Sequence, residues 1–206
     1  MRRTLPILAL IAAGLFGPVS AARAQDGAFN DAETRRLQRG ELVTRVREER
    51  RGNLLLIGGT SFQVVNAPAD TVWRAIRDTR AYRHYLPQVD RVRVVGAAGQ
   101  TETVRISHRQ GPLEAAYHLR LTFSDNLKTA QFRVDPARDN DIREGWGYLR
   151  VQPYGRNRSM VTWAILADVG SGIAVGLMRA EIREWILQVP RLMRDYLGWA
   201  RRRYEQ

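Results

Sequence analysis

The chain has 206 residues, 44% of them hydrophobic, which is enough for one domain with a sizeable core. It contains no cysteine, so disulfides, thiolate metal sites and a lipid-attachment thiol are excluded. Its formal net charge of +12 rests almost wholly on arginines scattered along the chain, a pattern that argues against nucleic acid binding. An anionic membrane surface and simple solubility remain as explanations of the charge.

The segment 1–24 predicts a cleaved export signal. Two arginines near its start supply the positive end, 5–19 form the apolar run, and 22–24 are a small-x-small cleavage site. The apolar run is shorter than the roughly 20 residues that span a bilayer, although a retained anchor is the alternative. We therefore expect a periplasmic or secreted protein that begins at Gln25.

The segment 25–53 is expected to form an N-terminal extension. Asn30 and Glu33 have the spacing of a capping box, which predicts a short helix that ends before Gly40. Weak alternation over 41–47 favours one additional strand. The charged residues that follow are expected to form a solvated turn.

The segment 54–206 is the predicted domain proper. A strand over 54–65 carries two adjacent glycines, 58–59, which indicate a bulge. Pro68 then opens a helix, because a proline in the first turn loses no hydrogen bond. Two short helices follow on one apolar side, which carries Trp73, Tyr82 and Tyr85.

Turn-forming residues divide the next part of the chain into six further strand-forming runs. With the strand at 54–65 they predict a curved, seven-stranded antiparallel sheet. The runs are 89–95, 101–109, 115–124, 127–134, 142–152 and 159–168.

The hairpin registers predict one apolar face on this sheet. A turn at 111–112 sets Ile106 opposite Tyr117, with polar residues on the other face. The same apolar face then holds Val104, His108 and Leu119. A turn at 125–126 sets Phe132 opposite Leu119 and so continues the face.

The last hairpin is expected to add aromatic residues to the same face. A turn at 155–156 sets Tyr148 beside Trp163 and Trp146 beside Ile165. These pairings make the predicted inner face rich in aromatic side chains.

Residues 174–204 predict one long terminal helix. Pro190 interrupts the helix without shifting its phase, so we expect a kink in which the hydrogen bond to Ile186 is lost. Apolar residues recur at steps of three and four, as in a helix that packs on a core. They are Met178, Ile182, Trp185, Ile186, Val189, Leu192, Met193, Tyr196, Leu197 and Ala200.

Four stretches resemble the START-like, or SRPBCC, superfamily. They are VVNAPADTVW at 64–73, YRHYLPQV at 82–89, GWGYLRVQP at 145–153 and the closing helix at 181–204. The resemblance covers 54–204 and is nearest to the polyketide cyclase/dehydrase and coenzyme-Q-binding branch. It implies an α+β helix-grip fold, in which a curved sheet surrounds a long C-terminal helix. It also implies an interior pocket for a lipid, quinone, sterol or polyketide, with catalysis in a minority of members.

The residues themselves leave two interpretations of the space between sheet and helix open. Its aromatic lining suits a site for an apolar small molecule, and it equally suits a packed core. The resemblance places the two short helices at the pocket entrance. The expected ligand-binding residues are Trp73, Tyr82, Tyr85, Val104, Ile106, His108, Tyr117, Leu119, Phe132, Glu144, Trp146, Tyr148, Trp163, Met178, Ile182 and Trp185.

His108 and Tyr117 are the candidates for chemistry. They have the residue types of an acid/base pair or of a hydrogen-bonding pair for a ligand, whereas a strand-end histidine that reaches water is the plain alternative. Glu144 would need a cationic partner if it points inward. The three histidines do not have metal-ligand spacing and no glycine-rich phosphate loop follows a strand, so we expect no metal and no cofactor.

We therefore expect an exported START-like protein that binds an apolar small molecule without chemistry. A cyclase or dehydratase that uses His108 and Tyr117 is one alternative. A packed domain that binds a partner protein through 45–51 is another. The expected partners are the apolar ligand and an anionic membrane surface, without nucleic acid, and the sequence leaves the oligomeric state open.

Overall fold

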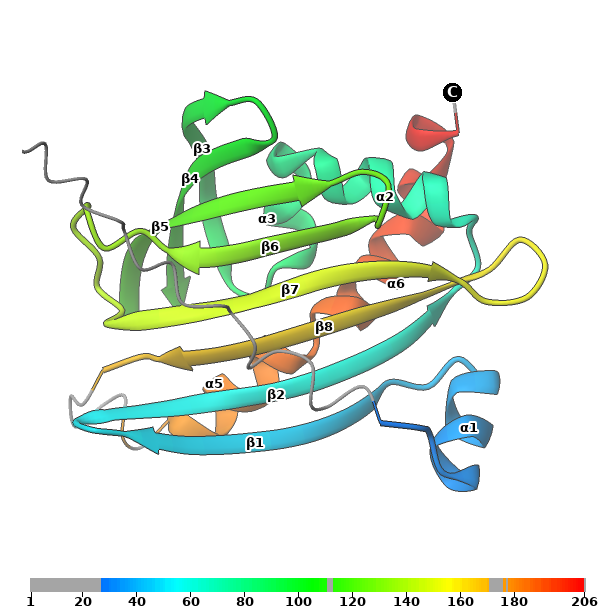
Figure 1. Ribbon diagram of the computed structural model, residues 1–206, viewed down its shortest axis with the longest axis horizontal. Helices are drawn as coiled ribbons and strands as arrows, with labels where there is room; N and C mark the ends of the chain where they lie inside the picture. Colours follow the sequence, from blue (N-terminus) through cyan, green and yellow to red (C-terminus); the bar gives the residue numbers. More distant parts are fainter. Residues whose placement is uncertain (1–26, 111–112, 171–175, 177, 206) are drawn as a thin grey trace, which may run out of the picture.

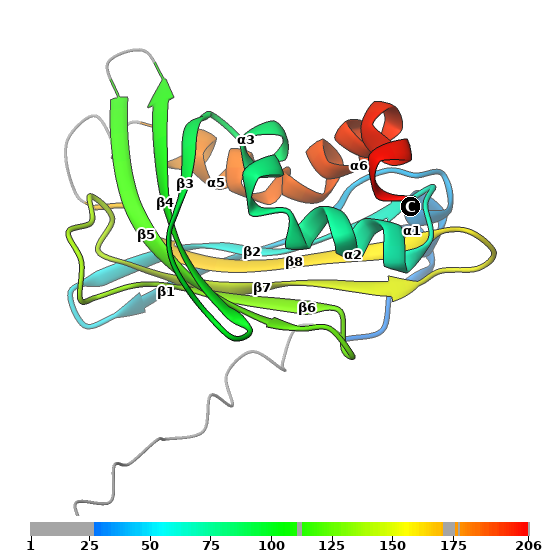
Figure 2. The same cartoon turned by 90° about the horizontal axis from the view of Figure 1, so that it is seen from above.

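An eight-stranded antiparallel sheet curves around two consecutive C-terminal helices in the computed structural model. The structure describes residues 27–110, 113–170, 176 and 178–205, so the predicted export signal lies outside the described residues. The strand order is β1-β2-β8-β7-β6-β5-β4-β3, and α2, α3, α5 and α6 lie on one face of the sheet (Figures 1 and 2). This arrangement confirms the predicted α+β helix-grip fold.

All seven predicted strands are present, and the sheet gains an eighth at its edge. The strands are β1 (Val43–Arg51), β2 (Leu54–Val65), β3 (Val89–Ala98), β4 (Thr101–Gln110), β5 (Leu113–Ser124), β6 (Thr129–Val134), β7 (Glu144–Pro153) and β8 (Ser159–Asp168). The helices are α1 (Asp31–Gln38), α2 (Ala69–Arg77), η1 (Thr79–Ala81), α3 (Tyr82–Tyr85), α5 (Arg179–Leu187), α6 (Val189–Ala200) and η2 (Arg201–Tyr204). Among these helices of the described residues, none is both long and apolar enough to span a membrane.

The eighth strand, β1, confirms the additional strand expected over 41–47 and corrects the prediction of a charged turn after it. The residues expected to form that turn continue β1, which pairs with β2 along its whole length. Backbone pairing with β2 satisfies their peptide groups while their charged side chains stay at the edge of the sheet.

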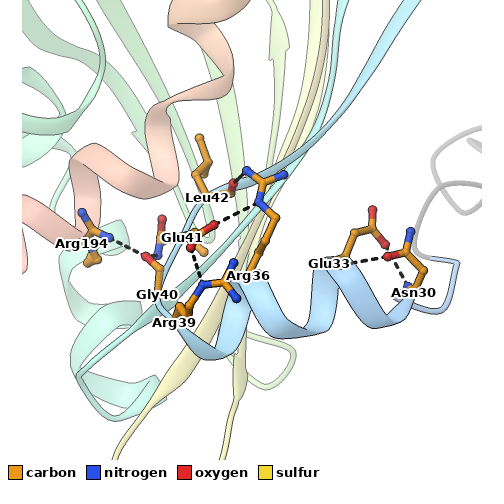
Figure 3. Close-up of polar contacts among 9 residues, drawn as sticks. Asn30, Glu33, Arg36, Arg39, Gly40, Glu41, Leu42 and Arg194 are labelled. Atoms are coloured by element: carbon orange, nitrogen blue, oxygen red, sulfur yellow. Dashed lines mark hydrogen bonds and ion pairs between the residues drawn. The ribbon is translucent and has the colours of Figure 1, made fainter.

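Helix α1 begins with the predicted capping box. The Asn30 side-chain oxygen accepts a hydrogen bond from the Glu33 backbone N–H at 2.9 Å, and the Glu33 carboxylate accepts one from the Asn30 N–H at 3.1 Å (Figure 3). Arg45 on β1 also donates to this carboxylate at 2.8 Å. Together the Arg45 guanidinium and the Asn30 N–H lower the pKa of Glu33 to about 2.

The turn after α1 ties the extension to the terminal helix. Gly40 adopts a φ of +73°, the left-handed conformation that ends a helix most easily when no Cβ is present. Its carbonyl oxygen accepts a hydrogen bond from Gln63 at 2.8 Å. It accepts another from Arg194 at 2.7 Å (Figure 3). Contacts from β2 and α6 therefore hold this turn in place.

The paired glycines of β2 do not form the predicted bulge. Gly58 and Gly59 pair in continuous register with both β1 and β8. Their φ angles are +150° and +142°, and a Cβ on Gly58 would lie 2.0 Å from the carbonyl oxygen of Ile165. The glycines instead allow an unusual extended backbone to approach its neighbours closely.

The three predicted hairpin registers have different outcomes. The first is confirmed, because Ile106 pairs with Tyr117 across β4 and β5. The second is wrong by two positions, since Phe132 pairs with Leu121 around a wider turn in which Lys128 has a φ of +45°. A shift of two positions leaves every side chain on its predicted face.

The third register is wrong by one position, and this changes the face. Ser159 pairs with Pro153, so the β7–β8 loop contains five residues, 154–158, instead of a tight two-residue turn. Trp163 consequently faces Leu149 rather than Tyr148. Because side chains alternate along a strand, the shift moves the β7 aromatic residues to the outer face of the sheet.

The sequence predicts one long terminal helix with a kink at Pro190, but the structure divides it there into two helices. Helix α5 ends at Leu187 and α6 begins at Val189, with Pro190 in the first turn of α6. Pro190 has no N–H to offer Ile186, whose carbonyl oxygen instead accepts a hydrogen bond from the Trp163 indole at 2.7 Å. The predicted helix start near 174 lies outside the described residues.

Candidate functional site

The inner face of the sheet, defined as the face toward α5 and α6, has two unlike ends. Helix α6 covers one end, and α5 covers the end where β4 and β8 finish and β5 and β7 begin (Figure 1). We call these the closed end and the open end. The candidate site is at the open end, for the reasons below.

Side chains of the closed end are packed against one another. Val104 and Ile106 are 0% exposed and lie in one apolar cluster with α6 residues. The Phe132 and Trp163 rings stack with centroids 4.7 Å apart. Leu119 belongs to the same cluster, so these predicted lining residues are on the inner face but form a core.

The two short helices cap this core. The Trp73 indole donates to Asp125 at 2.8 Å, and its ring packs edge-on against a phenylalanine of β5. The hydroxyls of Tyr82 and Tyr85 donate to backbone carbonyls of α2 at 3.1 and 3.3 Å. All three side chains are buried, so they stabilise the attachment of α2 and α3 to the sheet.

A histidine–tyrosine pair stands at the open end. His108 Nε2 lies 2.7 Å from the Tyr117 hydroxyl, and His108 Nδ1 lies 3.1 Å from the carbonyl oxygen of Pro87. A carbonyl can only accept, so Nδ1 carries the proton and Nε2 accepts from Tyr117. The loop that ends α3 thus orients the ring.

Burial keeps both members of this pair neutral. Burial lowers the pKa of His108, although the backbone carbonyls beside it act in the opposite direction. Burial also raises the pKa of the Tyr117 phenol. The pair therefore offers hydrogen bonds without a formal charge.

Helix α5 brings half-buried apolar side chains to the same end. Met178, Ile182 and Trp185 are each half-buried, and Leu187 is the buried residue of α5. The helix packs against β2 and β8, where Ile165 on the inner face is also half-buried. The open end therefore retains accessible apolar surface that the closed end lacks.

Three predicted lining residues are not at the site. Glu144, Trp146 and Tyr148 point to the outer face because of the one-residue register shift on β7. Glu144 forms an ion pair with Arg133 at 2.8 Å, and the Arg51 guanidinium lies 5.0 Å from the Trp146 ring. The expectation that they line the inner space is wrong.

The basic segment 45–51 is largely paired within the chain. Arg45 binds Glu33 at 2.8 Å, and Arg47 and Arg51 both bind Glu49, at 2.6 and 2.9 Å. These guanidinium groups are therefore already paired within the chain, which leaves them less able to bind a partner protein.

Two hollows on the surface were not predicted. One, of about 440 Å³, is lined by Gln38, Arg39, Gly40, Val64, Asn66, Arg158 and Arg194. The other, of about 910 Å³, lies beside β3 and α3 and is described below. Neither is lined by a predicted ligand-binding residue, so the enclosed pocket stays a prediction. Within the described residues, no cluster of histidine and acidic side chains could hold a metal ion.

Sequence reasoning missed Pro87 as part of the site. Its carbonyl fixes the His108 tautomer across 21 positions of sequence, yet a backbone oxygen has no signature in the sequence. Pro87 could be identified beforehand only as the residue that ends α3.

Three solved structures share the fold. A STAR-related lipid transfer protein from Xanthomonas axonopodis is 17% identical, with a TM-score of 0.62 over 76% of this chain and 93% of its own. A protein from Thermus thermophilus is 17% identical, with a TM-score of 0.60 over 71% and 98%. The Zhui aromatase/cyclase from Streptomyces sp. R1128 is 15% identical, with a TM-score of 0.55 over 77% and 96%. At these identities the likeness shows the fold.

A family model gives the more specific result. No curated protein matched the sequence. The model for polyketide cyclase/dehydrase and lipid transport proteins, however, matches residues 59–198, which is most of the chain and runs from within β2 to within α6. The chain therefore belongs to the polyketide cyclase/dehydrase and lipid transport family, within the START-like superfamily.

Proposed function

We propose that the protein binds an apolar small molecule, such as a lipid, quinone, sterol or polyketide, at the open end of the grip. One observation carries the proposal: His108, Tyr117 and Ile165 of the inner face, with the apolar side chains of α5, are only half-buried here, whereas the inner face under α6 is a packed core. Apolar surface beside a single polar pair is the usual composition of a small-molecule site. Burial of apolar ligand surface would contribute about 25 cal/mol per Å².

The polar pair gives the site a preference between ligand groups. The Tyr117 hydroxyl donates its only hydrogen bond to His108 Nε2. Its oxygen therefore has lone pairs left that can accept a hydrogen bond from a ligand. Pro87 occupies the other ring nitrogen of His108. The pair therefore favours a ligand hydroxyl over a carbonyl, for example a sterol over the matching ketone.

The comparisons support this class of ligand. The solved structures with the same fold include a protein named for lipid transfer and one named as an aromatase/cyclase. Both names imply molecules with large apolar surfaces. The family description also joins polyketide chemistry with lipid transport.

Two neighbouring alanines of β5 give a matched test. Ala115 pairs with His108 and shares its face, whereas Ala116 points to the outer face. Ala115→Trp should fill the open end and weaken binding of a sterol, quinol and fatty-acid panel at least tenfold. Ala116→Trp should leave binding unchanged. Mass spectrometry of protein purified from its own host would identify the ligand, and equal loss in both variants would contradict the site.

An enzyme is the second candidate, because His108 and Tyr117 are in direct contact. Proton transfer from Tyr117 to His108 would create an ion pair, which the raised pKa of Tyr117 and the lowered pKa of His108 both oppose. Binding is therefore the better-supported function. His108→Ala should leave most ligand affinity in a binder, whereas an acid/base enzyme would lose turnover by ~10²–10⁴-fold.

Export is part of the proposal. The charged start, apolar run and small-x-small site of 1–24 support cleavage before Gln25. Amino-terminal sequencing of the protein from its host tests this directly. A chain that keeps its first residues and stays with the membrane would favour the retained anchor.

A further inference from the structure

A basic groove lies at the sheet edge farthest from α1. It has a volume of about 910 Å³ and is formed by β3, by the turn η1 with α3, and by η2 at the C-terminal end. Figure 2 shows β3 beside α3, and Figure 1 shows β3 at the edge of the sheet opposite β1. The groove is lined by Asp78, Arg80, Ala81, Arg83, His84, Asp90, Arg91, Val92, Arg93, Val94, Val95 and Arg203.

The groove has an excess of positive charge that the chain does not neutralise. Its five arginines, against two aspartates, take part in no ion pair within the described part of the chain. One of the aspartates, Asp78, already accepts a hydrogen bond from the Tyr204 hydroxyl at 2.9 Å. Arg45, Arg47 and Arg51 on β1 are bound to glutamates instead, whereas these five are available to an external anion.

The lowered pKa of His84 agrees with this excess of positive charge. This side chain lies in the groove, and its pKa is lowered by burial and by the charges of Arg83 and Arg203. Arg83 donates a hydrogen bond to His84 Nε2 at 3.3 Å, as a neutral ring permits. The groove thus disfavours additional positive charge and favours a negatively charged partner.

Apolar side chains gather beside these arginines. Val94 and Val95 in the groove are 44% and 39% exposed, and Trp199 on α6 is 66% exposed. They are three of the five large hydrophobic side chains that are exposed among the described residues. The Trp199 ring packs edge-on against His84 and Tyr196, with centroids 5.9 and 4.9 Å away. These contacts fix the orientation of the ring while its side chain stays exposed to solvent.

This combination matches the surface of an anionic membrane. Arginines bind phosphate oxygens, and each basic residue near such a surface contributes about 1 kcal/mol. Tryptophan prefers the boundary between headgroups and acyl chains. A nucleic acid would satisfy the arginines and offer a base to stack on Trp199, but it would leave the two valines in water. We propose that the basic groove and Trp199 form a docking surface for membranes that contain anionic lipids.

The test measures partition of the full chain onto vesicles at 0.1 M salt. Vesicles of phosphatidylcholine with 30% phosphatidylglycerol are compared with pure phosphatidylcholine. The groove variant carries Arg83→Gln, Arg91→Gln and Arg93→Gln, and it should lose roughly 100-fold in partition to the anionic vesicles. Trp199→Ala should lose roughly fivefold. Since the apolar run at 5–19 is present in every variant, the differences report on the groove.

A matched control removes the same charge elsewhere. It carries Arg35→Gln, Arg50→Gln and Arg156→Gln, which are exposed and lie on α1, β1 and the β7–β8 loop, away from the groove. The control should bind anionic vesicles almost as the unmodified chain does, and both triple variants should keep the unmodified urea midpoint. Equal losses in the groove and control variants would overturn the proposal, and so would an equally large loss of the groove variant on neutral vesicles. So would tighter binding to a single-stranded oligonucleotide that the groove variant abolishes.

Discussion

The two ends of the grip use the same sheet face and the same terminal helix, yet they differ in how far they are filled. Under α6 the inner face is a continuous apolar cluster whose members are almost wholly buried. At the open end Ile57 is buried, but Ile165 and the bonded pair His108 and Tyr117 are only half-buried. The first end therefore supplies stability, and the second supplies accessible surface.

The break in the terminal helix explains the difference. Pro190 divides the helix, so α5 does not have to follow the line of α6 across the sheet. Trp163 donates its indole hydrogen bond to Ile186 at the break and anchors this point to β8. The packing of α5 on the sheet can therefore be looser than that of α6 without disturbing the core. Regions of low local stability on a stable scaffold are where binding sites commonly occur.

The sharpest test compares a tryptophan from each end. Trp163→Ala should reduce the free energy of unfolding by about 3–5 kcal/mol, because it removes a buried ring, its stack on Phe132 and the Ile186 hydrogen bond. Trp185→Ala at the open end should cost about 1 kcal/mol or less. Urea unfolding measures both. Similar losses would mean that the two ends are equally packed.

A second pair of variants tests how closely β7 approaches its neighbours. A Cβ on Gly147 would lie 1.9 Å from the Ala164 carbonyl oxygen and 2.6 Å from the Phe132 ring, so Gly147→Ala should cost about 1–3 kcal/mol. Gly145→Ala places its Cβ 3.4 Å from its nearest neighbours and should cost much less. Equal free energies of unfolding in urea for the two variants would show that β7 can shift to accommodate a Cβ at little cost.

The histidine at the open end predicts a pH dependence. The pKa of His108 is below its ordinary value near 6.5 in the folded state, so below pH 6.5 the unfolded chain takes up the proton first. Stability should fall as the pH drops from 6.5, by at most about 1.4 kcal/mol per pH unit for one histidine, and should level off below the folded pKa. His108→Asn should make this decline shallower.

A second histidine, His84, should contribute to the loss of stability below pH 6.5 and provides a control. The pKa of His84 is also lowered, so His84→Asn should remove a separate part of the slope. The double variant should show the shallowest decline of all. An unchanged slope in His108→Asn would mean that the ring is not held neutral.

The smallest expected effect concerns the extension, away from both ends. The pKa of Glu33 is about 2 in the folded state against 4.5 ordinarily, so its contribution is complete above pH 4.5 and is lost as the pH falls toward 2. Arg45→Ala should lower the free energy of unfolding by about 1 kcal/mol or less at pH 7. It should also reduce the loss of stability between pH 4.5 and pH 2. Acid titration followed by circular dichroism tests the prediction. Arg35→Ala is the control, since Arg35 has no ion pair within the described residues.

Patterns local to the chain determined most of the fold in advance. The capping box of α1, the proline in the terminal helix and the alternation of β4 and β5 each depend on neighbours in sequence, and each prediction is confirmed. The placement of His108 beside Tyr117 followed from one tight hairpin. The resemblance to the START-like superfamily agreed with these patterns and with the family model.

The tertiary structure decided what local patterns leave open. A five-residue loop in place of a tight turn reversed the faces of Trp146 and Tyr148, because side chains alternate with a period of two and loop length sets the parity. The Trp163 bond to Ile186 and the Pro87 bond to His108 join residues far apart in sequence. Local patterns thus determined which segments become strands and helices, whereas the number of residues in one loop and the bonds across the fold decided which aromatic side chains lie on the inner face.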